Sequence, residues 1–295
     1  VVYYLLTTAF AVIIGLIVAN VAKGLGWFPA LADTGSYEYE AATSNVMDVI
    51  VNIFPTNMWK SFTNADMLPV IVIALFFGAG ILVAGDKAKP FASFIDSAYE
   101  VVMVVMTFII KLTPIGVFCL MCNVVAVNGP SVLAGLGLAI LAAYIGYILH
   151  IVLVYGASAQ FLSKVGFVKF IKGMAPAMIT AFTTTSSNAT LPLTIECSNE
   201  LGSEPEISSF VLPLGATINM DGTAIYMGVC SIFIASCYGV DLTLSQMGMI
   251  VLTATLASIG TAGVSGAGMI MLAMVLESVG LPVAGIAIIA GVDKL

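Results

Sequence analysis

The sequence predicts an all-α protein that crosses a membrane several times. Of its 295 residues, 60% are apolar and only 8% are charged, and the mean hydropathy is +1.12. Soluble domains carry about a quarter of charged residues, so lipid has to solvate much of this chain. Its apolar runs also approach the length of roughly 20 residues that a membrane helix needs. A multi-pass helical fold follows from these observations.

The first half of the chain contains the continuous apolar segments. Polar or turn-forming residues separate them, among them Lys23-Gly24, Asp86 and Asn128-Gly129-Pro130. One segment is too long to cross a bilayer upright, and we expect Pro114 to kink or end its helix. The spans expected from this pattern are residues 1–22, 66–84, 91–127 and 131–162.

Lysines predict the orientation of these spans. Lys87 and Lys89 lie two passages before a second lysine group at residues 164–172, so both groups face the same side. Short cytoplasmic loops collect lysine and arginine, which places that side in the cytoplasm and the acidic loop at 33–40 outside. We therefore expect a multi-pass protein of the plasma membrane, or of the cell inner membrane in a bacterium.

From residue 173 onward the apolar segments become short. Runs of about 11 residues are half the length of a span, and small polar residues separate them. Interrupted backbone is tolerated at membrane depth only where it is buried or lines a watery cavity. Paired half-helices with polar tips are typical of re-entrant hairpins and broken helices in transporters. We expect hairpin 1 at 174–201, a broken helix at 207–238 and hairpin 2 at 246–279.

Asp221 is the residue that most strongly indicates function. It lies in a long, mostly uncharged stretch with no lysine near it in sequence, and an ionised carboxylate at mid-membrane is costly unless it is paired. A bound cation would pair it, and sodium favours hard oxygen ligands. The oxygen donors nearby are the side chains of Thr217, Asn219 and Thr223 and the carbonyls freed by an unwound helix around Gly215 and Gly222. The alternative is a protonated aspartate that is hydrogen-bonded in a core.

Two polar tips are candidates for substrate binding. The first is rich in hydroxyls and amides, and a half-helix N-terminus there would suit a substrate carboxylate; an ordinary capping turn is the alternative. The second is rich in glycine, which lets backbone approach a ligand and lets a hairpin move as a gate; tight helix packing is the alternative. The first tip comprises Ser186, Ser187, Asn188 and Thr190, and the second Ser258, Gly260, Thr261, Gly263, Gly266 and Gly268.

Other classes of function find little support. The chain has no arginine and no basic stripe, which disfavours a nucleic-acid partner. Cys119 and Cys122 lie in an apolar run, where two packed helix residues are expected rather than a metal or redox pair. His150, the single histidine, lies in an apolar helix without a cluster of ligands, so we expect it to pack in a core or an interface. No enzyme is expected, since the protease-like tripeptide at Asp33 falls in the outside loop, far from Asp221.

The chain resembles the glutamate-transporter family of dicarboxylate and amino-acid symporters, which are driven by sodium or protons. The resemblance rests on Leu212–Ala224, which contains Asn-Met-Asp-Gly-Thr, and on the tips Ser186–Pro192 and Ser258–Val264. Residues 1–10, Pro55-Thr-Asn57 and Pro114–Phe118 match in order. This family has a glutamate-transporter-like fold with two re-entrant helical hairpins and a broken helix. Its members are homotrimers in which a mobile unit moves like an elevator.

The resemblance also implies a division into domains. Residues 1–22 and 173–295 would form the transport unit, which ends in the truncated start of the last helix. Residues 43–172 would be mainly scaffold and trimer contact, and the helix at 131–162 would pack partly on the transport unit. The chain is expected to lack the family's first two helices and nearly all of its last one.

By similarity, the chain would bind sodium at three sites and the substrate between the hairpin tips. The sodium ligands would be Tyr4, Thr7, Thr8, Asn219 and Asp221 at one site, Gly215 with Asn219 at a second, and Thr217, Ser258, Ile259 and Thr261 at a third. Ser187, Thr223, Val264 and Gly268 would contact substrate, beside Ser186 and Asn188 of the first tip. Thr8 stands where many relatives have serine, and Ser265 where many have proline, which would loosen the outer gate.

The function implied is secondary active symport, in which sodium entry drives uptake of an acidic amino acid or a dicarboxylate. Proton coupling and a neutral amino-acid substrate such as serine or alanine are the alternatives. An ion channel is a third reading from another class, since polar tips inside a bilayer also form pores. In this family the last helix contacts the substrate side chain and determines specificity. Because nearly all of that helix is expected to be missing, the sequence does not distinguish an acidic from a neutral amino-acid substrate.

Overall fold

The computed structural model describes residues 2–30, 51, 54–64, 67–261, 263 and 267–293, and within these it contains helices and no strand. Four stretches of the described residues are long and apolar enough to cross a membrane, which agrees with the multi-pass prediction. They are Val2–Gly24, Pro69–Val102, Ser131–Leu162 and Pro205–Cys237. The predicted acidic loop at 33–40 lies outside the described residues.

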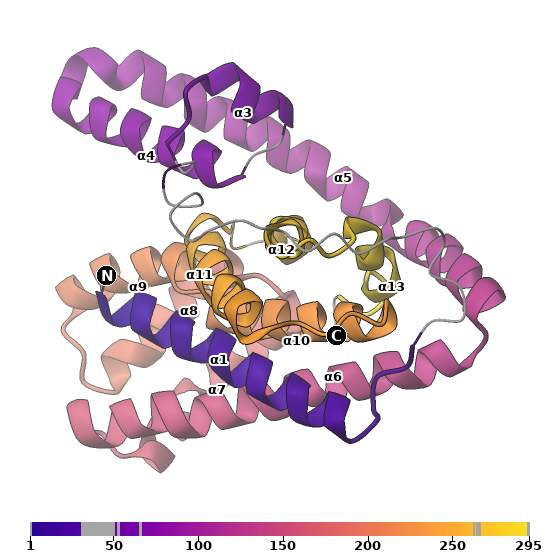
Figure 1. Cartoon of the computed structure of the whole chain (residues 1–295). Helices are drawn as coiled ribbons and strands as arrows, with labels where there is room; N and C mark the ends of the chain where they lie inside the picture. Colours follow the sequence, from indigo (N-terminus) through magenta and orange to yellow (C-terminus); the bar gives the residue numbers. More distant parts are fainter. Residues whose placement is uncertain are drawn as a thin grey trace.

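The centre of the molecule is a bundle around one buried helix (Figure 1). This is α10 (Asp221–Cys237), of which 13 of 17 residues are buried. It packs against α1 (Val2–Gly24), α6 (Ser131–His150) and α11 (Leu244–Gly260). A helix that is apolar on all sides and covered on all sides is typical of the core of a large or membrane-embedded protein.

Small residues let α1 and α10 approach closely. A Cβ atom added at Gly15 of α1 would lie 2.6 Å from the Ile225 carbonyl oxygen, and one at Gly228 of α10 would lie 3.1 Å from the Val12 carbonyl oxygen. A Cβ at Gly146 of α6 would likewise lie 2.8 Å from a methyl group of Ile225. Close backbone approach at small residues is the usual way in which membrane helices associate, and it fixes the N-terminus of α10 between α1 and α6.

A second group of helices extends away from this bundle (Figure 1). Its apolar side chains are largely exposed, including Leu75, Phe76 and Val83 of α4, as expected for helices that face lipid. Pro114 does not end the long helix here, because α5 continues through it. The group consists of α3 (Met58–Asn64), α4 (Met67–Ala84), the short 3₁₀ turn η1 (Gly85–Ala88) and the first part of α5 (Lys89–Asn128).

The three interrupted segments predicted after residue 173 are confirmed as pairs of helices. The helices of each pair continue into the polar tips. Hairpin 1 consists of α7 (Phe167–Thr184) and α8 (Ser187–Glu200), and the broken helix of α9 (Pro205–Ile218) and α10. Hairpin 2 consists of α11 and α12 (Ala267–Ser278), and α13 (Ile286–Ile289) follows the short turn η4 (Val283–Gly285).

The span predicted at 131–162 is not a uniform α-helix. After His150 it widens into two π-helical segments, η2 (Ile151–Gly156) and η3 (Ser158–Leu162). π-helical turns are rare and occur frequently at functional sites. The division into transport unit and scaffold remains a prediction.

Candidate functional site

Asp221 lies at the break of the broken helix and is buried, with 3% of its surface exposed. The break comprises Asn219 and Met220, whose backbone leaves the helical region at φ −116°, ψ 77° and φ −100°, ψ 58°. Asp221 is the first residue of α10. A carboxylate in this place is stabilised by the free amides and the positive end of the helix dipole.

Four side-chain and backbone groups converge beside this carboxylate. One terminal atom of the Asn219 amide lies 3.0 Å from Thr7 Oγ1, 3.1 Å from Thr8 Oγ1, 3.1 Å from the Tyr4 carbonyl oxygen and 2.9 Å from Asp221 Oδ1. Thr8 also donates a hydrogen bond of 2.7 Å to Asp221 Oδ1, and Thr7 one of 3.0 Å to the Tyr4 carbonyl. The structure therefore brings together the residues that the resemblance assigned to the first sodium site.

The Asn219 amide can face these groups in two ways. With its NH₂ inward, it donates to the surrounding oxygens. With its oxygen inward, it accepts from Thr7 and Thr8, but it also faces the Tyr4 carbonyl and the Asp221 carboxylate, which have no proton to share. Four oxygens then lie 2.9–3.1 Å from the amide oxygen, and a hard cation coordinated by these groups would offset their repulsion. The donor set thus suits sodium.

Tyr4 contributes to this cluster through its backbone rather than its ring. Its phenol donates a hydrogen bond of 3.0 Å to the Val211 carbonyl. The ring lies against Gly215, where an added Cβ would come within 2.9 Å of the phenol oxygen. Gly215, predicted to serve the second sodium site, is therefore in contact with the first cluster through Tyr4.

Two residues that the sequence did not point to hold the other carboxylate oxygen. His150 Nε2 lies 3.0 Å from Asp221 Oδ2, and the Tyr155 hydroxyl donates a hydrogen bond of 2.7 Å to the same oxygen. The expectation for His150 is thus half correct, because it is buried in the core but does have a polar partner. Asp221, which has no lysine near it in sequence, therefore has hydrogen-bond partners within the protein. The partners lie 66 and 71 residues away in sequence, where inspection of neighbouring residues does not find them.

The tips of the two hairpins touch. The Ser186 hydroxyl donates a hydrogen bond of 2.9 Å to the Gly263 carbonyl, and the Asn188 amide approaches the same carbonyl at 3.4 Å. Ser186 also caps α8, since its side chain accepts from the Ala189 amide. Ser187, the first residue of α8, is exposed beside this contact.

Comparison with known proteins identifies the family. The family model described as "Sodium:dicarboxylate symporter family" matches residues 1–295 of the chain. The chain is 33% identical to a "Proton/sodium-glutamate symport protein" of Geobacillus stearothermophilus over 302 residues, which cover all of this chain and 72% of that protein. It is 36% identical to a "C4-dicarboxylate transport protein" of Rhodopseudomonas palustris (strain BisB18) over 298 residues, which cover 99% of this chain and 66% of that protein. The chain belongs to the sodium:dicarboxylate symporter family.

Members of the sodium:dicarboxylate symporter family are membrane transporters, and the four apolar spans agree with that assignment. The predicted resemblance to glutamate transporters and the predicted fold class are therefore confirmed. Among the described residues, no three His, Cys, Asp or Glu side chains gather as they would around a transition metal. The oxygen-rich donor set at Asp221 is the candidate cation site of this symporter-family chain.

The other predicted site residues of this symporter-family chain are the remaining substrate contacts and the set expected at a third sodium site. Thr223 and Gly268 are neighbours, since an added Cβ at Gly268 would lie 3.2 Å from Thr223 Cγ2. The set expected at a third sodium site shows no mutual hydrogen bond, because its hydroxyls bond to carbonyls of their own helices: Thr217 to Leu214, Ser258 to Thr255 and Thr261 to Ala257. Ile259, between the last two, is partly buried at the end of α11, and Val264 lies outside the described residues.

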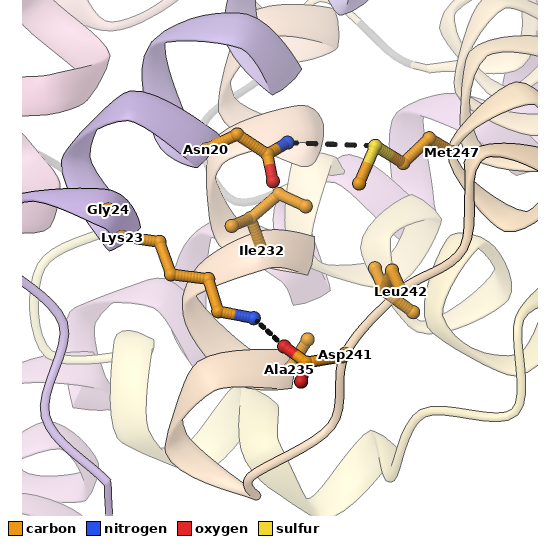
Figure 2. A pocket seen from close by; sticks show the side chains of 8 residues that line it. All are labelled: Asn20, Lys23, Gly24, Ile232, Ala235, Asp241, Leu242 and Met247. Atoms are coloured by element: carbon orange, nitrogen blue, oxygen red, sulfur yellow. Dashed lines mark hydrogen bonds and ion pairs between the residues drawn. The ribbon is translucent and has the colours of Figure 1, made fainter.

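A separate pocket of about 360 Å³ lies at the other end of α10 in the symporter-family fold (Figure 2). Two of the residues that line it, Lys23 and Asp241, form an ion pair of 2.6 Å, and Asn20 donates to Met247 Sδ at 3.6 Å. The ion pair ties the connection between α10 and α11 to the end of α1. The pocket is lined by Asn20, Lys23, Gly24, Ile232, Ala235, Asp241, Leu242 and Met247.

Proposed function

We propose that this chain is the core of a symporter that couples sodium entry to uptake of an acidic amino acid or a C4-dicarboxylate, without chemical conversion of the substrate. The observation that carries the proposal is the oxygen cluster at Asp221. An ionised aspartate in the centre of a membrane helix costs about 2.5–3.5 kcal/mol, and a bound cation offsets that cost. The two relatives reported above are named for glutamate and for C4-dicarboxylate transport.

The donor set favours sodium over the alternative of a protonated aspartate. A proton on Asp221 would satisfy one oxygen neighbour, whereas a carboxylate oxygen, two hydroxyls and a backbone carbonyl all lie within 3.1 Å of one atom of the Asn219 amide. Tyr4, Thr7, Thr8, Asn219 and Asp221 would hold the ion, with Gly215 beside them. A small hard cation takes several oxygen ligands at once.

The hairpin tips are where the substrate would bind. Ser186 and Asn188 reach Gly263 across the gap between hairpins, and the exposed N-terminus of α8 at Ser187 offers free amides to a carboxylate. Thr223, two residues after Asp221 on α10, would link the substrate to the ion site. Val264 and Gly268 would complete the substrate contacts. The third sodium site would form only when hairpin 2 rearranges, and its ligands would be Thr217, Ser258, Ile259 and Thr261.

Movement of the whole site would carry the substrate across the bilayer. In this proposal residues 1–22 and 173–295 move as the transport unit of a homotrimer, against a scaffold of residues 43–172. The exposed apolar side chains of α1, such as Phe10 and Ile17, would slide along the scaffold or lipid.

Proton coupling is the second candidate, because one relative is named for both protons and sodium. Uptake of labelled L-aspartate into liposomes that contain the full-length protein separates the two. Uptake is compared under three conditions at the same total salt concentration: an inward sodium gradient, an inward proton gradient, and no gradient. We expect uptake only with sodium; uptake that follows the proton gradient alone would replace sodium by the proton.

Competition in the same assay tests the substrate class. An excess of succinate is expected to suppress L-aspartate uptake, and L-serine is expected to leave it unchanged. Suppression by L-serine would indicate the neutral amino-acid alternative. Currents without substrate accumulation would indicate a channel.

A further inference from the structure

The two oxygens of the Asp221 carboxylate have different partners. Oδ1 faces the oxygen cluster, where Thr8 donates to it at 2.7 Å and the Asn219 amide lies 2.9 Å away. Oδ2 faces the opposite side, where it meets Tyr155 at 2.7 Å and His150 at 3.0 Å. Tyr155 and His150 therefore hold the carboxylate through Oδ2, which leaves Oδ1 to coordinate a cation in the oxygen cluster.

The holding side depends on the change of helix type after His150. His150 is the last residue of α6, and Tyr155 lies five residues later in η2. In an α-helix each residue turns by about 100°, so residues five apart would point about 140° away from each other. A π-helix pairs residues five apart through its hydrogen bonds, which places them on one face. The two rings accordingly pack edge to face, with centroids 4.8 Å apart.

The partners of His150 show which of its nitrogens faces Asp221. Nε2 lies 3.0 Å from Oδ2, whereas Nδ1 is buried without a hydrogen-bond partner among the described residues. Because a carboxylate oxygen accepts, the hydrogen bond runs from an N–H at Nε2 to Oδ2, and His150 is a donor that holds this oxygen.

We propose that His150 and Tyr155 are positioning residues that fix Asp221 Oδ2, so that Oδ1 points into the oxygen cluster and sets the affinity for sodium. This inference rests on the proposed function. Partners that orient a metal ligand from behind commonly change metal affinity by 10–100-fold when they are removed. The short-range geometry at Asp221 has the same form: a ligand oxygen on one side and two fixed donors on the other.

Sodium titrations on variants of the full-length protein test this inference. Tyr155→Phe removes one donor with little change of shape, His150→Leu removes the other, and His150→Gln keeps an N–H donor. We expect Tyr155→Phe and His150→Leu to raise the half-saturating sodium concentration for uptake about tenfold, with the maximal rate at saturating sodium retained. His150→Gln is expected to stay within about threefold of the wild type.

Tyr147→Phe on α6 is the matched control, since Tyr147 packs against the core and not against Asp221. Its sodium half-saturation is expected to equal that of the wild type. Sodium-induced thermal stabilisation of the purified protein provides a readout without transport and should shift in parallel. Equal half-saturation in all variants, with only the folded yield reduced, would show a purely structural role and overturn the inference. Sodium-independent uptake by the wild type would instead overturn the proposed function, and this inference with it.

Discussion

The Ser186 hydroxyl donates a hydrogen bond of 2.9 Å to the backbone carbonyl of Gly263, 77 residues further along the chain. Ser186 stands at the start of the second half of hairpin 1, and Gly263 lies at the tip of hairpin 2. Thr223 of α10 and Gly268 of hairpin 2 are also in contact. Opening of one hairpin from the other must break this hydrogen bond, so the contact is where access to the substrate would be controlled.

Gly263→Val is expected to weaken substrate binding. A Cβ at this position would lie 2.7 Å from Asn188 Oδ1 and 3.4 Å from the Asn188 backbone nitrogen, so the Asn188 side chain has to turn away and the valine crowds the contact between the tips. We expect the half-saturating substrate concentration in the uptake assay to rise about tenfold, or about 1.4 kcal/mol. Gly248→Val on α11 is the control, since no atom lies within 4 Å of its added Cβ. Equal substrate affinity in both variants would mean that the tip contact does not hold the site closed.

The hydroxyl of Thr8 is expected to matter more than the rest of its side chain. It bonds to both Asp221 and Asn219 and is fully buried. Thr8→Val keeps the shape and loses the hydroxyl, and we expect sodium affinity to fall by about tenfold or more, since hydrogen bonds to charged groups contribute about 1.5–3 kcal/mol. Thr8→Ser keeps the hydroxyl and should bind sodium like the wild type. If the serine variant lost affinity as strongly as the valine variant, packing rather than the hydroxyl would be responsible.

Gly15→Ala is expected to destabilise the bundle. The added Cβ would lie 2.6 Å from the Ile225 carbonyl oxygen, which is backbone and cannot turn aside. Overpacking of this kind costs about 1–3 kcal/mol, so thermal unfolding in detergent should occur several degrees lower. Gly78→Ala on α4 has open space around it and should unfold like the wild type. A Gly15→Ala variant of unchanged stability would show that α1 and α10 are less closely packed than described.

The ion pair at the pocket predicts a small pH effect. The hydrogen bond and the charge of the Lys23 ammonium hold the pKa of the Asp241 carboxyl below its ordinary value. The pair thus contributes stability above the unfolded pKa of about 3.9, and this contribution is lost as pH falls through the lower folded pKa. Because Asp241 is exposed, the contribution is small.

Asp241→Asn is therefore expected to unfold at a slightly lower temperature than the wild type at pH 7. At a pH below the lowered folded pKa the two should unfold alike, because the wild-type carboxyl is then protonated as well. Thermal unfolding across this pH range measures the difference. A difference that persisted at low pH would show that the side-chain amide, not the lost charge, causes it.

The sequence predicted the helical pairs well, because apolar runs of half the length of a span, separated by polar residues, can be recognised directly in the sequence. It also predicted a broken helix at 207–238, which the structure interrupts at Asn219 and Met220. Asp221 begins α10, where a carboxylate is favourable because it lies at a helix N-terminus. The resemblance to symporters grouped Tyr4, Thr7, Thr8, Asn219 and Asp221, and the fold brings these residues together. Their role as sodium ligands stays a prediction.

The sequence could not have indicated His150 and Tyr155 in the same way. A histidine in an apolar helix is ordinarily a core residue, and its partner lies 71 residues away. The two side chains face Asp221 together because the helix becomes π-helical after His150, and the apolar run at 131–162 gives no sign of that change. A lone histidine and a buried aspartate in one apolar chain are nevertheless a pair worth testing for contact.

The central claim is that Asp221 binds sodium through its oxygen cluster. Thermal unfolding of the purified full-length protein and of Asp221→Asn, measured in rising sodium with choline replacing it at constant ionic strength and without substrate, tests this most directly. A bound ion raises the unfolding temperature in proportion to the logarithm of its concentration above the dissociation constant. We expect sodium to stabilise the wild type and to have little effect on Asp221→Asn. Equal stabilisation of both proteins by sodium would contradict the claim.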